Sequence, residues 1–157
     1  MRSFHMHEFD HSLSIEAPAS RVLDAFFDHA DLEAWWHVSR SLCHPRSFGS
    51  YALEWPPTEW KDDLLGRLGG AFRGTVIEFK AGREFFVADA YWLPPDGEPI
   101  GPMSLQVTCT TLDARVVLRV RQSGWDKSPR WSRYYEVLSA NLTRSLNELK
   151  THLEAGA

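Results

Sequence analysis

An apolar stripe near the carboxyl end of the chain most constrains its fold. Ser128-Pro129 is typical of a helix start, because serine caps helix amino termini and proline suits the first helical position. From there apolar side chains recur every three or four residues, at Trp131, Tyr135, Leu138, Leu142, Leu146, Leu149 and Leu153. The pattern predicts one amphipathic helix over 129–155, about 40 Å long. A lone helix of this kind must bury its stripe against a sheet.

Short strands joined by tight turns are predicted upstream of that helix. Apolar alternation and turn signals indicate strands at 11–16, 48–55, 71–80, 83–93, 103–112 and 115–123. Because short connections join antiparallel neighbours, these strands should form an antiparallel sheet. We therefore expect an α+β fold in which a curved sheet wraps around the long helix, with residues 1–157 forming one domain.

Two short helices are predicted after the first strand. Pro18 fits a first helical turn, and the apolar residues at 22–27 recur at helical spacing. Asp31 is a candidate N-cap for the second helix. A loop is expected at 38–46.

Composition and charge exclude several classes of protein. The 157 residues carry a formal net charge of −4, whereas proteins that bind a phosphate backbone usually show a basic face. No apolar run reaches the roughly 20 residues of a membrane span, and the amino terminus lacks the pattern of a signal peptide. The two cysteines make no disulfide framework and fit a reducing cytoplasm. We expect a cytoplasmic protein with no membrane span, no nucleic-acid partner and no cofactor.

Several motifs, in this order and spacing, resemble the START-like superfamily, also known as SRPBCC, helix-grip or Bet v-like. Within it, the chain most resembles the branch named after the activator of the heat-shock chaperone ATPase. The resemblance covers about residues 9–155 and rests on segments 13–22, 31–36, 74–78, 122–125 and 146–154. A polar insertion at 56–70, expected to hold one helical turn at 60–65, is longer than usual.

The resemblance implies a deep cavity between sheet and long helix that takes a hydrophobic small molecule. Seven Trp, nine Phe and four Tyr fit either aromatic cavity walls or a thick core. By this resemblance, the segment with Trp35 and Trp36 should lie near the cavity mouth. The two tryptophans either act as a gate or a stacking surface for a flat ligand, or pack the short helix on the sheet. The candidate ligand-binding residues are Trp35, Trp36, Tyr51, Trp55, Phe72, Tyr91, Leu105, Val107, Leu118, Trp131, Tyr135, Leu138 and Leu142.

The strand at 83–93 is apolar on both faces, so the sequence does not decide which face points inward. Burial of both faces, with a dimer partner covering one of them, is one explanation. Asp89 is a weak candidate catalytic acid or base if its face is inward, and a solvated acid otherwise. Three arginines either clamp a ligand carboxylate or stay solvated: Arg73, Arg119 and Arg121.

Histidines and cysteines give no convincing metal or nucleophile pattern. His5, His7 and His11 lie at the terminus, and His37, Cys43 and His44 flank one loop, without an acid to orient them. No metal site is therefore expected.

The sequence thus predicts binding of a hydrophobic or aromatic small molecule, in a carrier, sensor or resistance-type role. One alternative is a cyclase, dehydratase or hydrolase that uses the same cavity. Another is a domain that interacts with a chaperone or forms a homodimer, for which an aromatic strand and Trp125 are the motivation.

Overall fold

A curved antiparallel sheet and one long helix make up most of the structure, a computed structural model that describes residues 6–126 and 128–156. The order of elements is β1 (Met6–Ile15), α1 (Ala19–Asp24), α2 (His29–Trp36), β2 (Arg40–Cys43), β3 (Ser50–Trp55), β4 (Lys61–Asp62), β5 (Gly66–Arg67), β6 (Gly70–Lys80), β7 (Glu84–Leu93), β8 (Ile100–Leu112), β9 (Arg115–Trp125) and α3 (Pro129–Ala155). Seven strands form the sheet in the order β1-β9-β8-β7-β6-β3-β2, and β4 pairs with β5 in a separate hairpin.

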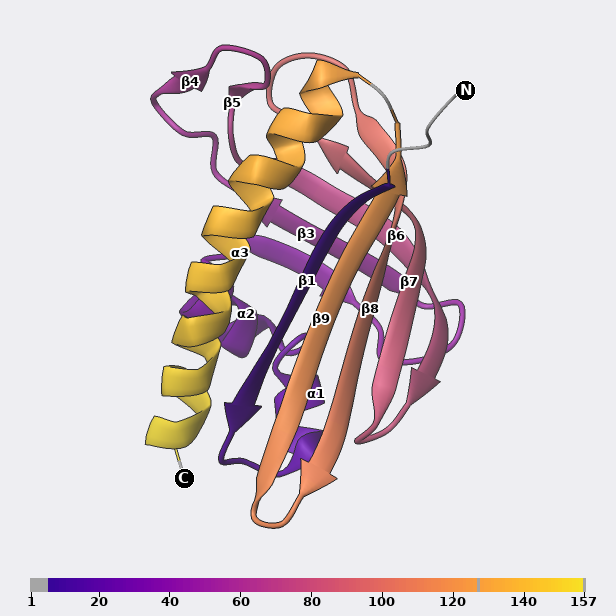
Figure 1. Ribbon diagram of the computed structural model, residues 1–157, viewed down its shortest axis with the longest axis vertical. Coiled ribbons are helices and arrows are strands. Elements are labelled where there is room, and N and C mark those ends of the chain that lie inside the picture. Colours follow the sequence, from indigo (N-terminus) through magenta and orange to yellow (C-terminus); the bar gives the residue numbers. More distant parts are fainter. Residues whose placement is uncertain (1–5, 127, 157) are drawn as a thin grey trace.

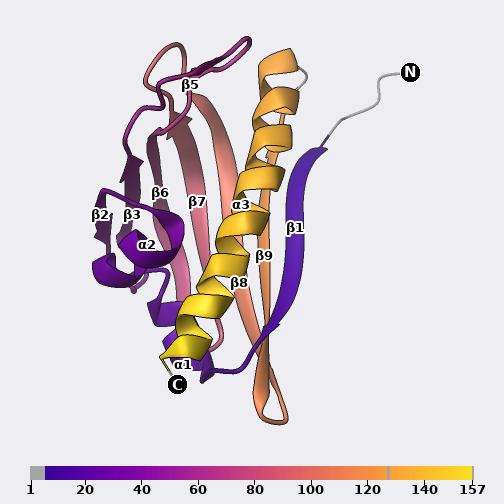
Figure 2. The ribbon, with the colours of Figure 1, turned by 90° about the vertical axis from the view of Figure 1, so that its left-hand side faces the viewer.

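The sheet is open, and α3 lies along its concave side (Figure 1). In the view turned by 90°, α3 stands between β1 on one side and β2, β3 and α2 on the other (Figure 2). The prediction of an α+β, helix-grip architecture is confirmed. No helix in the described part of the chain is both long enough and apolar enough to cross a membrane.

Helix α3 begins and ends where its sequence pattern predicts. The Ser128 side chain accepts a hydrogen bond from the Trp131 backbone amide, and Pro129 occupies the first helical position. The buried residues of the helix are Trp131, Tyr134, Tyr135, Leu142, Leu146, Leu149 and Leu153. The stripe therefore faces the sheet, with Leu138 half-buried beside it.

The N-cap of α2 is Asp28, so the prediction of Asp31 as the cap is wrong. Asp28 Oδ1 accepts a hydrogen bond from the Asp31 backbone amide at 3.1 Å. The Asp31 carboxylate is buried and accepts two hydrogen bonds from Arg21, at 2.6 and 2.7 Å. His152 Nε2, in the last turn of α3, lies 2.8 Å from the same carboxylate. One acidic side chain thus joins α1, α2 and the end of α3.

Three local predictions differ from the structure. Strand β1 begins at Met6 rather than at residue 11. Strand β2 occupies part of the expected loop at 38–46 and has little apolar alternation, with Leu42 exposed. Residues 60–65 belong to the β4–β5 hairpin and do not form a helical turn, because Asp62 Oδ2 accepts hydrogen bonds from the backbone amides of Leu64 and Leu65 in the turn.

Strand β7 is apolar on both faces because its inward face changes along its length. Phe85 and Val87 are buried, whereas beyond a register shift Ala90 and Trp92 are the buried residues. Asp89 lies at this shift and has a left-handed φ of 52°. The irregularity interrupts the strict alternation of side chains between the two faces of the strand, so a different set of positions faces inward beyond it. The sequence left open which face of this strand points inward, and each of the two faces does so over one half of its length.

Candidate ligand-binding cavity

A cavity of about 470 Å³ lies between α3 and strands β3, β6 and β7. The β4–β5 hairpin and the end of α2 complete its walls. Its lining is mostly aromatic and aliphatic: Trp36, Trp55, Pro56, Trp60, Leu65, Leu68, Phe72, Trp92, Tyr134, Val137, Leu138 and Leu142. His37, Thr58, Gly69, Gln122, Asn141, Arg144 and Ser145 supply the rest. The volume is within the range of small-molecule sites.

Hydrogen bonds to backbone carbonyls fix two of the four tryptophan rings that line the cavity. Trp55 Nε1 donates to the Trp36 carbonyl at 2.8 Å, and their rings meet edge to face with centroids 5.5 Å apart. Trp92 Nε1 donates to the Gly69 carbonyl at 2.8 Å, and its ring stacks on Tyr134 at 5.2 Å. Because the indole N–H groups are satisfied in this way, the rings present apolar surfaces to the cavity.

Gln122 is the polar group on the sheet wall of the cavity. It continues the inward-facing set of β9, after Val116, Leu118 and Val120, and is buried. Gln122 Nε2 donates a hydrogen bond to Tyr134 Oη at 2.9 Å. Burial raises the pKa of the Tyr134 phenol, which therefore stays neutral and able to hydrogen-bond.

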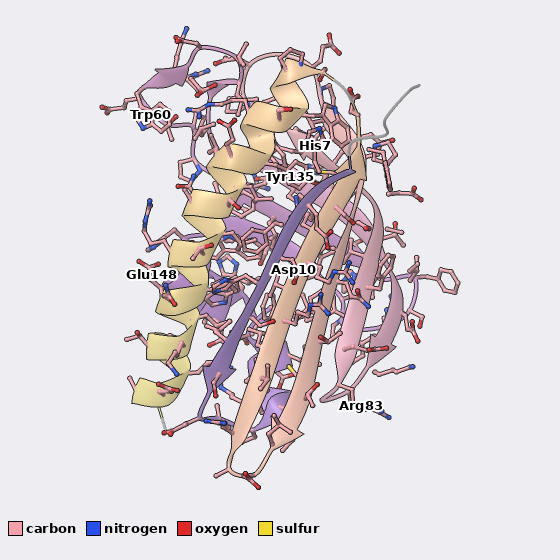
Figure 3. The ribbon with its side chains drawn as sticks, in the orientation of Figure 1. His7, Asp10, Trp60, Arg83, Tyr135 and Glu148 are labelled. Carbon is pink, nitrogen blue, oxygen red and sulfur yellow. The ribbon has the colours of Figure 1, made fainter. Side chains whose placement is uncertain are left out.

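The neighbouring Tyr135 points toward β1 rather than into the cavity. Its ring stacks on His7 at a centroid distance of 5.6 Å, and Figure 3 shows the two side chains together between α3 and β1. Its hydroxyl is buried without a hydrogen-bond partner among the described residues. Burial raises the pKa of this phenol as well.

The β4–β5 hairpin is held against α3 by an ion pair. Arg133 Nε donates to Asp62 Oδ1 at 2.7 Å, and the Asp62 side chain is only 5% exposed. Burial alone would raise the pKa of Asp62, but the hydrogen bonds from Arg133 and from the Leu64 and Leu65 amides outweigh it and lower the pKa. The hairpin buries Leu65 against the cavity, whereas the side chain of Trp60 is 57% exposed. Figure 3 labels Trp60 on the hairpin.

Removing the charge of Asp62 should loosen this hairpin. Asp62→Asn keeps an acceptor for the backbone amides but loses the ion pair with Arg133, so we expect hydrogen–deuterium exchange of residues 58–68 to accelerate several-fold. Glu136→Gln is the matched control, because Glu136 is an exposed second partner of Arg133 at 3.1 Å. Equal exchange in both variants would mean that the Asp62 pair does not hold the hairpin.

Five of the candidate ligand-binding residues lie at the cavity: Trp36, Trp55, Phe72, Leu138 and Leu142. Seven others are packed in the core: Trp35, Tyr51, Leu105, Val107, Leu118, Trp131 and Tyr135. Tyr91 is on the outer face of β7, 38% exposed. The adjacent tryptophans of α2 divide the two roles, since Trp36 lines the cavity and Trp35 stacks behind it at 4.7 Å.

The segment from α1 to α2 explains why much of the predicted wall is core. Phe26 and Phe27 pack edge to face on Phe85, and Tyr51 Oη donates to the Phe26 carbonyl at 3.0 Å. Trp35 Nε1 donates to the Ala25 carbonyl at 2.8 Å. These contacts fill one end of the space between sheet and helix, and the cavity is left at the other end.

The charged candidates lie outside the cavity. Asp89 is exposed, so it is the solvated acid of the two alternatives and does not supply an acid or base to the cavity. Arg119 pairs with Asp10 at 2.6 Å, Arg121 with Glu8 at 2.7 Å and Arg73 with Glu54 at 3.5 Å.

The histidine and cysteine candidates have other partners. His37 Nε2 lies 2.9 Å from Glu148 Oε2. Cys43 Sγ contacts the Ala52 carbonyl, and burial raises the pKa of the thiol to about 11, which makes it a poor nucleophile. Within residues 6–126 and 128–156 no group of three or more His, Cys, Asp or Glu is placed to hold a metal ion. His5 lies outside the described residues.

The candidate list from the sequence left out most of the lining, including Trp92, Gln122, Tyr134 and Arg144. Strand alternation from Val116 to Val120 already points to Gln122, and helical spacing from Leu138 points back to Tyr134. No comparable signal existed for Trp92, because the change of face in β7 depends on a backbone irregularity.

Comparisons with known proteins find solved structures of similar fold but no relative of similar sequence. No family model matches the sequence, and no curated protein matches it significantly. Protein MLL2253 from Mesorhizobium loti has a TM-score of 0.72 and 16% identity, over 96% of this chain and 98% of that chain. The Aha1 dimer from Colwellia psychrerythraea has a TM-score of 0.64 and 15% identity, over 95% and 97%.

A protein of the dynemicin biosynthetic locus, DynU16, has a TM-score of 0.64 and 18% identity, over 96% of this chain and 48% of its own. At these identities the similarity concerns the fold alone. The chain therefore shares with these proteins its overall fold, a curved antiparallel sheet with a long carboxyl-terminal helix.

Proposed function

We propose that this protein binds a hydrophobic or aromatic small molecule in the cavity between α3 and the sheet, as a carrier, a sensor or a resistance-type binding protein. The observation that carries the proposal is the cavity itself, about 470 Å³ and walled by tryptophan, phenylalanine and leucine side chains. Burial of apolar ligand surface at roughly 25 cal/mol per Å² would supply most of the affinity. The proposal treats residues 1–157 as one START-like, cytoplasmic domain.

Binding is favoured over catalysis by the chemistry of the lining. An enzyme of the cyclase, dehydratase or hydrolase type needs a group that exchanges protons inside the cavity. The described residues that line the cavity include no Asp, Glu, Lys or Cys, and their one histidine, His37, has an exposed side chain whose Nε2 lies 2.9 Å from Glu148 Oε2. Gln122 and Tyr134 can orient a ligand by hydrogen bonds without exchanging a proton near neutral pH.

Native mass spectrometry of the purified protein tests the proposal, together with titration of the apolar fluorescent probe N-phenyl-1-naphthylamine. We expect a discrete co-purified mass or saturable binding of one probe molecule per chain. A bare mass combined with no saturable probe binding would count against a ligand-binding role.

A homodimer is a second candidate, supported by exposed aromatic side chains. Trp125 at the end of β9 is 60% exposed, and a protein of similar fold has been solved as a dimer. Sedimentation velocity at micromolar concentration should show a dimer that Trp125→Ser converts to monomer. A monomer for the unaltered protein would exclude this candidate. A chaperone partner remains an expectation from the resemblance.

A further inference from the structure

The charged groups around the cavity are unbalanced in sign. The whole chain has 21 Asp and Glu against 17 Lys and Arg. Among the described residues that line the cavity, however, there is no Asp or Glu, and Arg144 is the one side chain with a permanent charge. A single cation at the wall of an apolar cavity produces a local positive potential that an anionic ligand would meet first.

Arg144 has no ionic partner among the residues that the structure describes. Most arginines on helices and strands are paired, as Arg133 is with Asp62 at 2.7 Å and Arg21 is with Asp31 at 2.6 Å. No such pair or side-chain hydrogen bond joins Arg144 to any other described residue. Glu148, one helical turn further on, lies 2.9 Å from His37 Nε2 instead. The guanidinium of Arg144 therefore keeps its hydrogen-bond donors available for a ligand.

Arg144 is well separated from the hydrogen-bonded pair of Gln122 and Tyr134 in the cavity lining. Tyr134 and Arg144 are ten residues apart on α3, which corresponds to about 15 Å along the helix axis. Between them the helix lines the cavity with the apolar residues Val137, Leu138 and Leu142 and with the polar Asn141, and Phe72 lines it from the sheet. A ligand with an apolar body and one acidic end would fit this succession of surfaces.

We propose that the cavity selects aromatic acids, with the ring system against the apolar wall and the carboxylate or sulfonate on Arg144. Arginine suits this role, because its planar fork of donors matches the geometry of an oxyanion. This inference rests on the proposed function, since it names the class of ligand for the same cavity.

Two fluorescent probes with one ring skeleton provide the test. N-phenyl-1-naphthylamine is neutral, and 8-anilinonaphthalene-1-sulfonate is the same skeleton with an added sulfonate. We expect the sulfonate probe to bind about three- to tenfold more tightly, as for one partly solvated, charge-assisted contact. Arg144→Gln should remove this preference by weakening the sulfonate probe alone.

Arg83→Gln is the matched control for loss of an arginine. Arg83 is exposed at the turn between β6 and β7, at the opposite end of the molecule from the hairpin that carries Trp60 (Figure 3). This variant should bind both probes as the unaltered protein does. A competitor without fluorescence, 2-naphthoate against naphthalene, should show the same preference.

The outcomes separate this inference from the function on which it rests. Equal affinity for the two probes, unchanged in Arg144→Gln, would overturn the selection of acids and leave ligand binding intact. Saturable binding of neither probe would overturn the proposed function itself. A loss of affinity for both probes in a folded Arg144→Gln protein would assign Arg144 to the shape of the cavity, and would also overturn the inference.

Discussion

Leu138→Arg is expected to weaken binding of N-phenyl-1-naphthylamine about thirtyfold. Leu138 is half-buried on α3 and lines the cavity, so a guanidinium at this position occupies the space of the ligand and places a charge on the apolar wall. Loss of about 80 Å² of apolar contact at roughly 25 cal/mol per Å² is about 2 kcal/mol, which gives this factor. Fluorescence titration measures the change in Kd directly.

Two further variants distinguish loss of the cavity from other effects. Leu138→Trp should also weaken binding, because it fills the same space without adding charge. Leu112→Arg is the matched control, since Leu112 is 48% exposed near the β8–β9 turn and does not line the cavity. Circular dichroism and thermal melting establish that each variant is folded. Unchanged binding by a folded Leu138→Arg protein would show that the ligand does not occupy this cavity.

The sequence predicts the fold well because its strongest signals are local. The stripe from Trp131 to Leu153 and the cap at Ser128 define α3 with little ambiguity. Alternation and turn residues place the strands β6 to β9, whose neighbours in the chain are also neighbours in the sheet. The elements that were missed, β2 and the β4–β5 hairpin, are short and form through pairing or a single side chain such as Asp62.

The cavity was harder to predict, since its place depends on what fills the rest of the space. Nothing local to Tyr51 indicates that Phe26 and Phe27 occupy the adjacent volume. The wall near Trp92 depends on the irregularity at Asp89, where a left-handed residue changes which side chains face inward. Periodicity thus distinguishes inside from outside, whereas the division of the inside into core and cavity is a tertiary property.

Asp31→Ala is expected to lower the free energy of unfolding by about 2–3 kcal/mol. The Asp31 side chain is 10% exposed and accepts charge-assisted hydrogen bonds from Arg21, with His152 Nε2 at 2.8 Å. Removing a buried, hydrogen-bonded carboxylate leaves these partners without their acceptor and detaches α2 from the end of α3. Urea denaturation at pH 7 measures the change. Glu33→Ala on the same helix is the control, because the Glu33 side chain is 69% exposed and should matter by less than about 0.5 kcal/mol.

The pH dependence gives a second signature of the same carboxylate. Hydrogen bonds from Arg21 hold the pKa of Asp31 below its ordinary value, against the opposing effect of burial. A carboxyl whose pKa is lowered on folding stabilises the protein above its unfolded pKa of about 3.9, and this contribution disappears as the pH falls through the folded-state pKa. The stability difference between the unaltered protein and Asp31→Ala should therefore shrink as the pH falls below about 4. A difference that stays the same at low pH would show that packing, rather than the charge of Asp31, joins the helices.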